Sequence, residues 1–289
     1  MYKRVCEFCE LKNILIPYIG TNFFSLPTEK LIQVNLSTFI RCIQDPPEAI
    51  GNLLIVQGGL RQIPTKQSYY LKHASYYFDS NTRVFVFEQF NPLIDFNTVS
   101  DLTAIFKYIR KKYKEPLAAI GFSMGGILIS AYLAKTEKIK DDPNLFITCC
   151  NSFDIVGFRQ VLETNSLFNW IRQRDLNSFG FKTYDELKVA YEITEEQEQY
   201  MNSLIENLNK NSDRWKNLLW IVGANDPLTL NYKEQLSQFK RPPYTLICEE
   251  GWHCTSDCIR TAIESATEFL IRLREDKRFS LRDLKQIIK

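Results

Sequence analysis

The sequence has little net charge and no long apolar run, and both absences narrow what the chain can bind. Its 36 Lys and Arg residues and 34 Asp and Glu residues leave a formal net charge of only +2. No excess of either charge therefore favours nucleic acid or an anionic membrane as a partner. No apolar run reaches the ~18 residues typical of a transmembrane helix. Glu7, Glu10 and Lys12 interrupt the apolar core that a signal peptide would need at the N-terminus, so we predict no signal peptide. We expect a cytoplasmic protein, with peripheral membrane contact through the basic residues 278–289 left open.

The cysteines do not form a recognisable disulfide or metal framework. Cys6 and Cys9 make a lone CxxC pair without the second pair that a zinc site needs. Cys149, Cys150 and Cys248 lie in apolar, strand-like stretches, where reduced thiols pack as small hydrophobic groups. We therefore predict free thiols and no metal site.

The chain also lacks internal repeats, low-complexity tracts and linkers, and instead alternates short apolar runs with helical periods. Near-continuous apolar strands indicate burial on both faces, hence a mostly parallel sheet flanked by helices, the α/β class. An entirely helical block at 152–215 interrupts this alternation and predicts a helical cap inserted into a core of residues 1–151 and 216–289. The N-terminal 45 residues are expected to add antiparallel strands at one edge. The predicted strands are 52–59, 82–90, 116–123, 144–151, 217–226 and 244–250.

One motif, "GFSMGG", contains a candidate catalytic residue, Ser123. It lies between a predicted strand and a predicted helix, the context of a nucleophile elbow. Gly121 and Gly125 remove side chains where strand and helix must approach closely, and the turn would raise the serine hydroxyl above the edge of the sheet. The other interpretation is a glycine-rich turn with an incidental serine. We predict that Ser123 is a nucleophile.

A serine nucleophile needs a base, and the chain has only two histidines, His73 and His253. After a nucleophile elbow the acid and then the histidine follow along the chain. Only His253, just past the last predicted strand, satisfies this order. Asp226, at the carboxyl end of a predicted strand, is the predicted orienting acid, and Asp154 is its rival.

The oxyanion of acyl transfer requires two preorganised N–H donors. The backbone N–H of Met124, directly after the nucleophile, is the first candidate. The second should come from the loop after the first central strand, where Gly59 is the best candidate and Leu60 the next.

Together these residues resemble the α/β-hydrolase superfamily over about residues 50 to 275. The resemblance rests on the elbow, the "GANDP" acid turn and the "GWH" histidine turn, and residues 99–134 are most similar to YheT-like esterases and their phospholipase relatives. Two departures stand out: Gln57-Gly58 replaces the His-Gly that many members carry at the oxyanion turn, and Trp252 replaces a glycine before the histidine. The resemblance implies hydrolysis or transfer of an acyl group without a metal or organic cofactor.

The cap sequence predicts the kind of acyl group. Its first half is rich in aromatic residues, which favours an apolar entrance and a small-molecule ester, thioester or lipid with an apolar acyl part as substrate, with a small polar ester as the alternative. Phe153, Leu60 and Trp252 are the predicted substrate-binding residues. An acyltransferase, a serine peptidase and a non-catalytic or slowly hydrolysing receptor with the same three residues stay open as alternatives.

Overall fold

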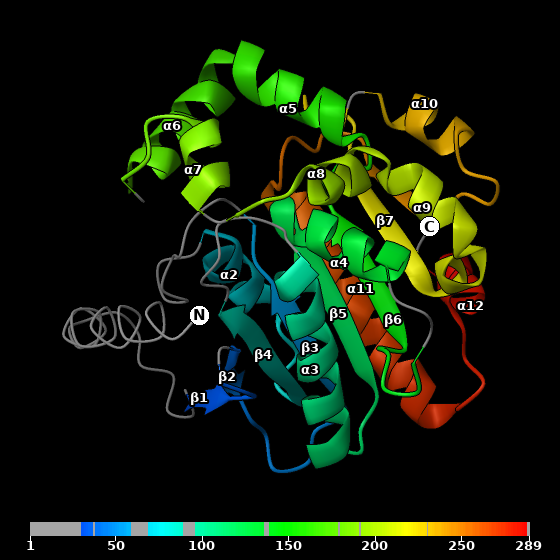
Figure 1. Cartoon of the computed structure of the whole chain (residues 1–289). Coiled ribbons are helices and arrows are strands. Elements are labelled where there is room, and N and C mark those ends of the chain that lie inside the picture. The colour runs from blue at the N-terminus through cyan, green and yellow to red at the C-terminus, as the bar shows by residue number, and fades with distance from the viewer. Residues whose placement is uncertain are drawn as a thin grey trace.

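An eight-stranded sheet lies at the centre of the protein in the computed structural model (Figure 1). The sheet order is β1-β2-β4-β3-β5-β6-β7-β8. The strands are β1 (Lys30–Gln33), β2 (Phe39–Gln44), β3 (Gly51–Val56), β4 (Thr82–Glu88), β5 (Leu117–Phe122), β6 (Leu145–Cys149), β7 (Leu218–Gly223) and β8 (Tyr244–Cys248). The structure describes residues 30–36, 38–58, 69–88, 96–135, 139–178, 180–190, 192–229 and 231–287.

The fully buried strands of the sheet are parallel to one another. β3, β5, β6 and β7 are buried along their whole length and pair in parallel, as expected for strands covered on both faces. β8 continues the parallel sheet at one edge, and β1 and β2 add antiparallel strands at the other. All six predicted strands and the antiparallel edge are therefore confirmed. Residues 1–29, which the edge prediction also included, lie outside the described residues.

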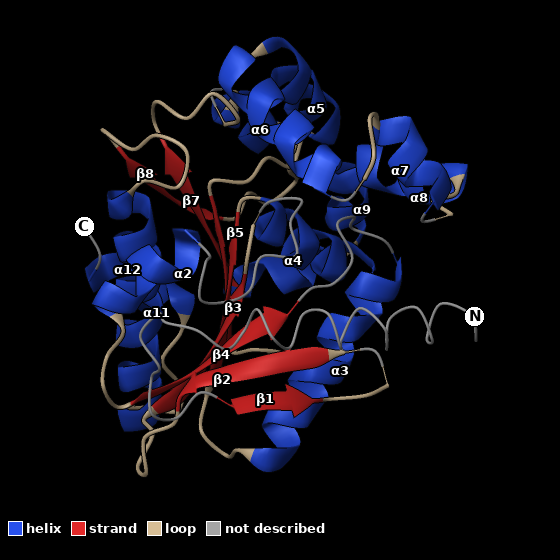
Figure 2. Ribbon diagram, turned by 90° about the vertical axis from the view of Figure 1, so that its left-hand side faces the viewer, coloured by secondary structure: helices blue, strands red, loops and turns tan. Residues whose placement is uncertain are grey.

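Two layers of helices cover the two faces of the sheet (Figure 2). Helices α3, α4 and α9 pack on one face, and α2, α11 and α12 on the other. Each face has its own large cluster of buried apolar side chains, so the sheet separates two hydrophobic cores. Outside the inserted block the helices are α2 (Tyr69–Ala74), α3 (Phe96–Lys112), α4 (Met124–Lys135), α10 (Tyr232–Ser237), α11 (Ser256–Glu275) and α12 (Leu281–Ile287).

The block between β6 and β7 is helical, and its two halves pack differently. Leu176 and Leu187 form a small separate cluster, whereas Leu204 and Leu208 belong to the main core under α4. The Tyr200 hydroxyl also donates to the Ala131 carbonyl of α4 at 3.2 Å. Ile155 and Phe158 of α5 belong to the same cluster as Leu204 and Leu208. We therefore propose that α6 and α7 form the outer part of the cap and that α5, α8 and α9 attach it to the core. The five helices are α5 (Ile155–Thr164), α6 (Ser166–Ser178), α7 (Tyr184–Ala190), α8 (Glu195–Asn202) and α9 (Leu204–Lys210).

Within the described part of the chain, no helix combines the length and the apolar character that crossing a bilayer requires.

A buried ion pair fastens the end of the helical block to the core. The Arg214 guanidinium donates to Asp142 Oδ2 at 2.8 Å, and the Tyr132 hydroxyl of α4 donates to Asp142 Oδ1 at 2.5 Å. Both charged side chains are less than a tenth exposed. Burial raises the pKa of the Tyr132 phenol above its usual range, so this hydroxyl stays protonated and keeps donating.

Replacing one partner of this pair should be costly. We expect Asp142→Ala to lower the free energy of unfolding by about 3–5 kcal/mol, because it removes the carboxylate that pairs with the buried Arg214 charge. Urea denaturation followed by circular dichroism measures the change. Asp257→Ala removes an exposed carboxylate that pairs with Arg260 on α11 and should cost about 0.5 kcal/mol or less. Equal losses in the two variants would contradict the argument.

Candidate active site

Ser123 occupies the single turn between β5 and α4. Its φ of 50° lies in the left-handed region, which costs a non-glycine residue strain energy. Hydrogen bonds hold it there: the Ser123 N–H donates to the Cys149 carbonyl at 2.9 Å, and the Gly126 N–H donates to the Ser123 carbonyl at 2.9 Å. The strained turn that the "GFSMGG" motif predicts is therefore present.

The glycines of the motif permit close approach of the backbone. A Cβ on Gly121 would collide with the Gly125 carbonyl group, and one on Gly125 would collide with the carbonyl oxygen of Val56 at the end of β3. A side chain at either position would force the helix away from the sheet. These contacts place the start of α4, and with it the serine, against the carboxyl end of β3.

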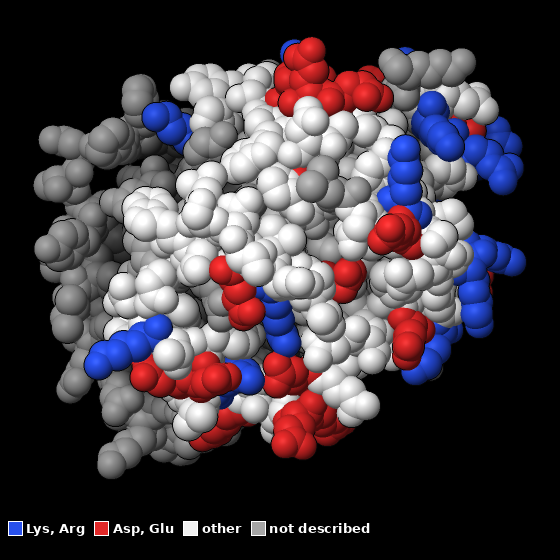
Figure 3. All heavy atoms as spheres, turned by 90° about the horizontal axis from the view of Figure 1, so that it is seen from above, with Lys and Arg blue, Asp and Glu red and all other residues white. Residues whose placement is uncertain are grey.

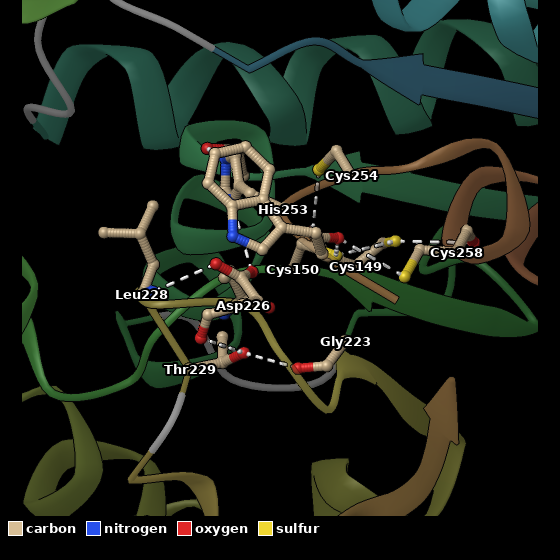
Figure 4. A network of polar contacts seen from close by, with 12 residues as sticks. Cys149, Cys150, Gly223, Asp226, Leu228, Thr229, His253, Cys254 and Cys258 are labelled. Atoms are coloured by element: carbon tan, nitrogen blue, oxygen red, sulfur yellow. Dashed lines mark hydrogen bonds and ion pairs between the residues drawn. The ribbon is translucent and has the colours of Figure 1, made fainter. Parts of the chain in front are cut away.

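The structure brings Ser123, His253 and Asp226 together, although they lie on three separate loops. Figure 4 shows His253 and Asp226 side by side. His253 Nδ1 is 2.9 Å from Asp226 Oδ2, and His253 Nε2 is 3.0 Å from Ser123 Oγ. A carboxylate only accepts hydrogen bonds, so Nδ1 carries the proton and donates to Asp226. The unprotonated Nε2 then accepts from the serine hydroxyl, as a general base must.

The Asp226 carboxylate is fully buried and held from two sides. Oδ2 accepts from His253, and Oδ1 accepts from the Leu228 N–H at 3.0 Å. The turn around it is tied to the histidine loop, because the Asn225 N–H donates to the Gly251 carbonyl at 2.9 Å. A Cβ on Gly223 would lie 2.6 Å from that same carbonyl oxygen, so the two loops are in direct backbone contact.

The competing candidates have other roles. Asp154 caps α5: its Oδ1 accepts from the Gly157 N–H at 2.9 Å, and its Oδ2 accepts from Asn231 Nδ2 at 3.2 Å. Glu249 and Glu250 are exposed at the end of β8. His73 lies on α2, away from the serine loop in sequence and on the opposite side of the sheet from α4.

The first predicted oxyanion donor is well placed. Met124 is the first residue of α4, so its N–H lies at the positive end of the helix dipole and directly follows the nucleophile. Among the described residues no backbone hydrogen bond uses this N–H. The second donor, predicted at Gly59 or Leu60, lies outside the described residues. The preceding Gly58 is buried and lies two residues after the end of β3.

The two remaining predicted substrate-binding residues differ in access to solvent. Trp252 is 37% exposed and directly precedes His253. Phe153 is 1% exposed, and its ring packs edge-on against Trp220 and Phe239 with centroids 4.7 and 5.2 Å away. The structure thus gives Phe153 a packing role instead of the pocket-lining role expected from the sequence, because its loop turns inward toward β7 and α10.

Sequence reasoning missed a buried amide network behind the acid turn. The Gln235 side chain is fully buried, and its Oε1 accepts from the Phe153 N–H at 2.8 Å and from the Asp154 N–H at 3.3 Å. Its Nε2 donates to Asn231 Oδ1 at 2.5 Å. The network joins the segment after the acid to the segment that leads into α5. Glutamine within an amphipathic helix carries no signal that separates it from a surface residue.

The comparisons with solved structures agree on the fold. Carboxyl esterase 2 of the fungus Tuber melanosporum matches with a TM-score of 0.59 and 12% identity, over 86% of this chain and 87% of that one. Est1E of Butyrivibrio proteoclasticus matches with a TM-score of 0.53 and 14% identity, over 85% of this chain and 98% of that one. An acylaminoacyl peptidase of Pyrococcus horikoshii matches with a TM-score of 0.54 and 14% identity, over 95% of this chain but 45% of that one.

No protein-family model matches the sequence. At these identities the structural matches establish the fold, and the similarity to the YheT-like branch stays a prediction. The chain has the α/β-hydrolase fold, with a mostly parallel eight-stranded sheet and flanking helices.

Proposed function

We propose that the protein is a serine hydrolase that cleaves a carboxylic ester through an acyl-enzyme on Ser123. The observation that carries the proposal is the continuous hydrogen-bonded series from Ser123 Oγ through both ring nitrogens of His253 to the buried Asp226 carboxylate. Its chain order of serine, acid and histidine is that of nucleophile-elbow enzymes on this fold. The esterases among the structural neighbours are consistent with this chemistry.

In the first half-reaction, Ser123 Oγ attacks the ester carbonyl carbon while its proton passes to His253 Nε2. The carbonyl oxygen becomes an oxyanion, which the Met124 N–H would stabilise from the start of α4. The resulting imidazolium then donates its proton to the leaving alkoxide oxygen. The C–O bond of the ester breaks, the alcohol departs and the acyl group stays on Ser123.

In the second half-reaction, water replaces the alcohol. His253 Nε2 takes a proton from the water, whose oxygen attacks the acyl carbon, and returns that proton to Ser123 Oγ as the carboxylic acid leaves. The Asp226 carboxylate holds the imidazole in the tautomer that exposes Nε2 as a base. Its negative charge also stabilises the imidazolium of both half-reactions, and burial away from water strengthens that effect.

The acyl group is proposed to be apolar. Trp252, next to His253, presents an indole that is 37% exposed, and the cap carries exposed apolar side chains at Val156, Leu167 and Trp170. Seen from above, the end of the molecule that includes the cap shows a broad area without charged groups (Figure 3). An uncharged surface of this kind favours contact with an acyl chain over contact with a charged substrate.

Labelling with a fluorophosphonate probe tests the nucleophile. We expect the wild-type protein to form one covalent adduct, located at Ser123 by peptide mass spectrometry, because the activated hydroxyl attacks the phosphorus. Ser123→Ala should remain unlabelled while keeping the wild-type circular dichroism spectrum. A folded wild-type protein that fails to label would rule out the proposal.

Substitution of the histidines tests the base. His253→Ala should lower kcat/KM for p-nitrophenyl butyrate by about 10⁴-fold or more, since within the described part of the chain no other basic side chain is hydrogen-bonded to the serine hydroxyl. His73→Ala is the matched control and should retain most of the activity. Asp226→Asn should lower kcat strongly at unchanged fold, because the amide favours the wrong imidazole tautomer. Comparable losses in both histidine variants would contradict the assignment.

A series of p-nitrophenyl esters tests the apolar acyl group. From acetate to octanoate we expect kcat/KM to rise, because each buried methylene contributes up to about 0.8 kcal/mol of transfer free energy. Trp252→Ala should flatten this increase more than it changes the rate for acetate. Activity that is equal for all chain lengths, or that falls with length, would show that the acyl preference is wrong while leaving the nucleophile assignment intact.

A further inference from the structure

Several buried cysteines lie beside the histidine loop and have no part in the proposed reaction (Figure 4). Cys149 ends β6 and Cys150 follows it, while Cys254 directly follows His253. All three side chains are at most 1% exposed. Their three sulfur atoms lie within 4.8 Å of one another, although they come from two segments more than a hundred residues apart.

The backbone is bent so that two adjacent thiols meet. Successive side chains of a strand point to opposite faces, which would keep Cys149 and Cys150 apart. Cys150 instead has a φ of 53°, and the two sulfurs are 3.8 Å apart. Cys254 has a φ of 49°. Positive φ is unfavourable for cysteine, and backbone strain of this kind clusters at functional sites.

The 3.8 Å between the sulfurs of Cys149 and Cys150 equals the separation of two thiolates bound to one metal ion, and all three sulfurs lie within 4.8 Å of one another. A Zn–S bond of about 2.3 Å with tetrahedral angles sets neighbouring sulfurs about 3.8 Å apart. A fourth thiol is near: Cys258 Sγ lies 3.8 Å from the carbonyl oxygen of Trp252, which Cys150 Sγ also approaches at 4.0 Å. Packing alone would be satisfied by alanine or valine and would not require three sulfurs to converge.

We propose that Cys149, Cys150 and Cys254 supply three ligands of a buried structural site for a thiophilic metal ion, Zn²⁺, with the nearby Cys258 as the candidate fourth ligand. Soft thiolate ligands select Zn²⁺ or Cu⁺, and the divalent ion offsets more of the negative charge that three or four buried thiolates carry. The site has no access to solvent, so the ion would be bound as the chain folds and would not meet the substrate.

Binding exchanges protons for the metal. Burial raises the pKa of Cys149 and Cys254 well above the usual range, and the thiol contact with Cys149 raises that of Cys150 to about 12. Each of these thiols is therefore protonated without metal, and one proton leaves for every thiol that binds Zn²⁺ as a thiolate. The ion would tie the end of β6 to the segment that follows His253, and so hold the base in register with the nucleophile.

Metal content of the purified chain tests this proposal. The protein is expressed with added zinc, purified without a polyhistidine tag and analysed by inductively coupled plasma mass spectrometry. We expect about one zinc per chain, with copper absent. Cys150→Ser and Cys254→Ser should each lower the zinc content at least about tenfold, because a closed site tolerates the loss of a ligand poorly.

Two controls locate the site. Cys42→Ser removes a buried cysteine on β2 and should leave the zinc content unchanged. The double variant Cys6→Ser/Cys9→Ser should also keep it, which separates the proposed site from the CxxC pair. If the serine variants fail to fold, Co²⁺ exchanged into the wild-type protein should give the thiolate charge-transfer absorption of a tetrahedral sulfur site.

Four results would overturn the proposal. The first is a folded wild-type protein that contains no zinc, and the second is a protein that contains copper in place of zinc. The third is zinc content that falls in the Cys6→Ser/Cys9→Ser or the Cys42→Ser variant. The fourth is a disulfide among the three cysteines, detected by mass spectrometry of the unreduced protein. Each of these is independent of labelling at Ser123, so failure of the metal site and failure of the proposed hydrolase are distinguishable.

Discussion

The hydrogen bond between the buried Asp226 carboxylate and His253 Nδ1 is the interaction on which the site depends. A fully buried carboxylate is expensive unless its oxygens are satisfied, and here one oxygen accepts from the histidine and the other from the Leu228 amide. The Leu228 amide belongs to the same turn as the acid, whereas the histidine is within reach because the acid and histidine loops touch through their backbones at Gly223 and Gly251. Loss of the histidine would therefore leave the acid partly unsatisfied, so the base contributes to stability as well as to chemistry.

Strain at the nucleophile is possible because the surrounding sheet is rigid. Ser123 adopts a left-handed conformation that costs of order 1–3 kcal/mol. The Ser123 N–H is nevertheless satisfied by the Cys149 carbonyl on the neighbouring strand, and the first turn of α4 closes on the Ser123 carbonyl. The parallel pairing of β5 and β6 fixes that carbonyl in place. The position of the hydroxyl is thus a consequence of strand register, which explains why the motif needs a strand before it and a helix after it.

Features that depend on neighbouring residues, such as strands and the turn at Ser123, were predictable from the sequence. Contacts between distant segments were predictable only in part. Continuous apolar runs identified the strands, and glycine spacing identified the elbow, because both reflect local sterics. Chain order with only two histidines identified His253. The role of Phe153 was not predictable, since an aromatic residue after a strand serves a pocket or a core equally well and tertiary packing decides between them. The bounds of the cap, 152–215, rest on helical pattern alone and stay a prediction, because periodicity does not reveal the layer in which a helix lies.

The cysteines illustrate the same limit more sharply. Adjacent thiols in a strand are expected to point apart, so sequence spacing predicted packing and gave no reason to group Cys149 and Cys150 with Cys254. Their convergence depends on two positive φ angles that only the folded backbone reveals. Cys150 directly follows β6, and Cys254 lies between His253 and the start of α11, so both angles occur next to the catalytic residues, as does the strained angle at Ser123. Three of the four non-glycine residues with positive φ in the described chain therefore lie at one end of the sheet, and the fourth, Glu192, lies in the helical block. Ser123 is itself strained, and His253 directly precedes the strained Cys254. Interactions that hold β5, β6 and the start of α11 together therefore help to set the distance between His253 and Ser123.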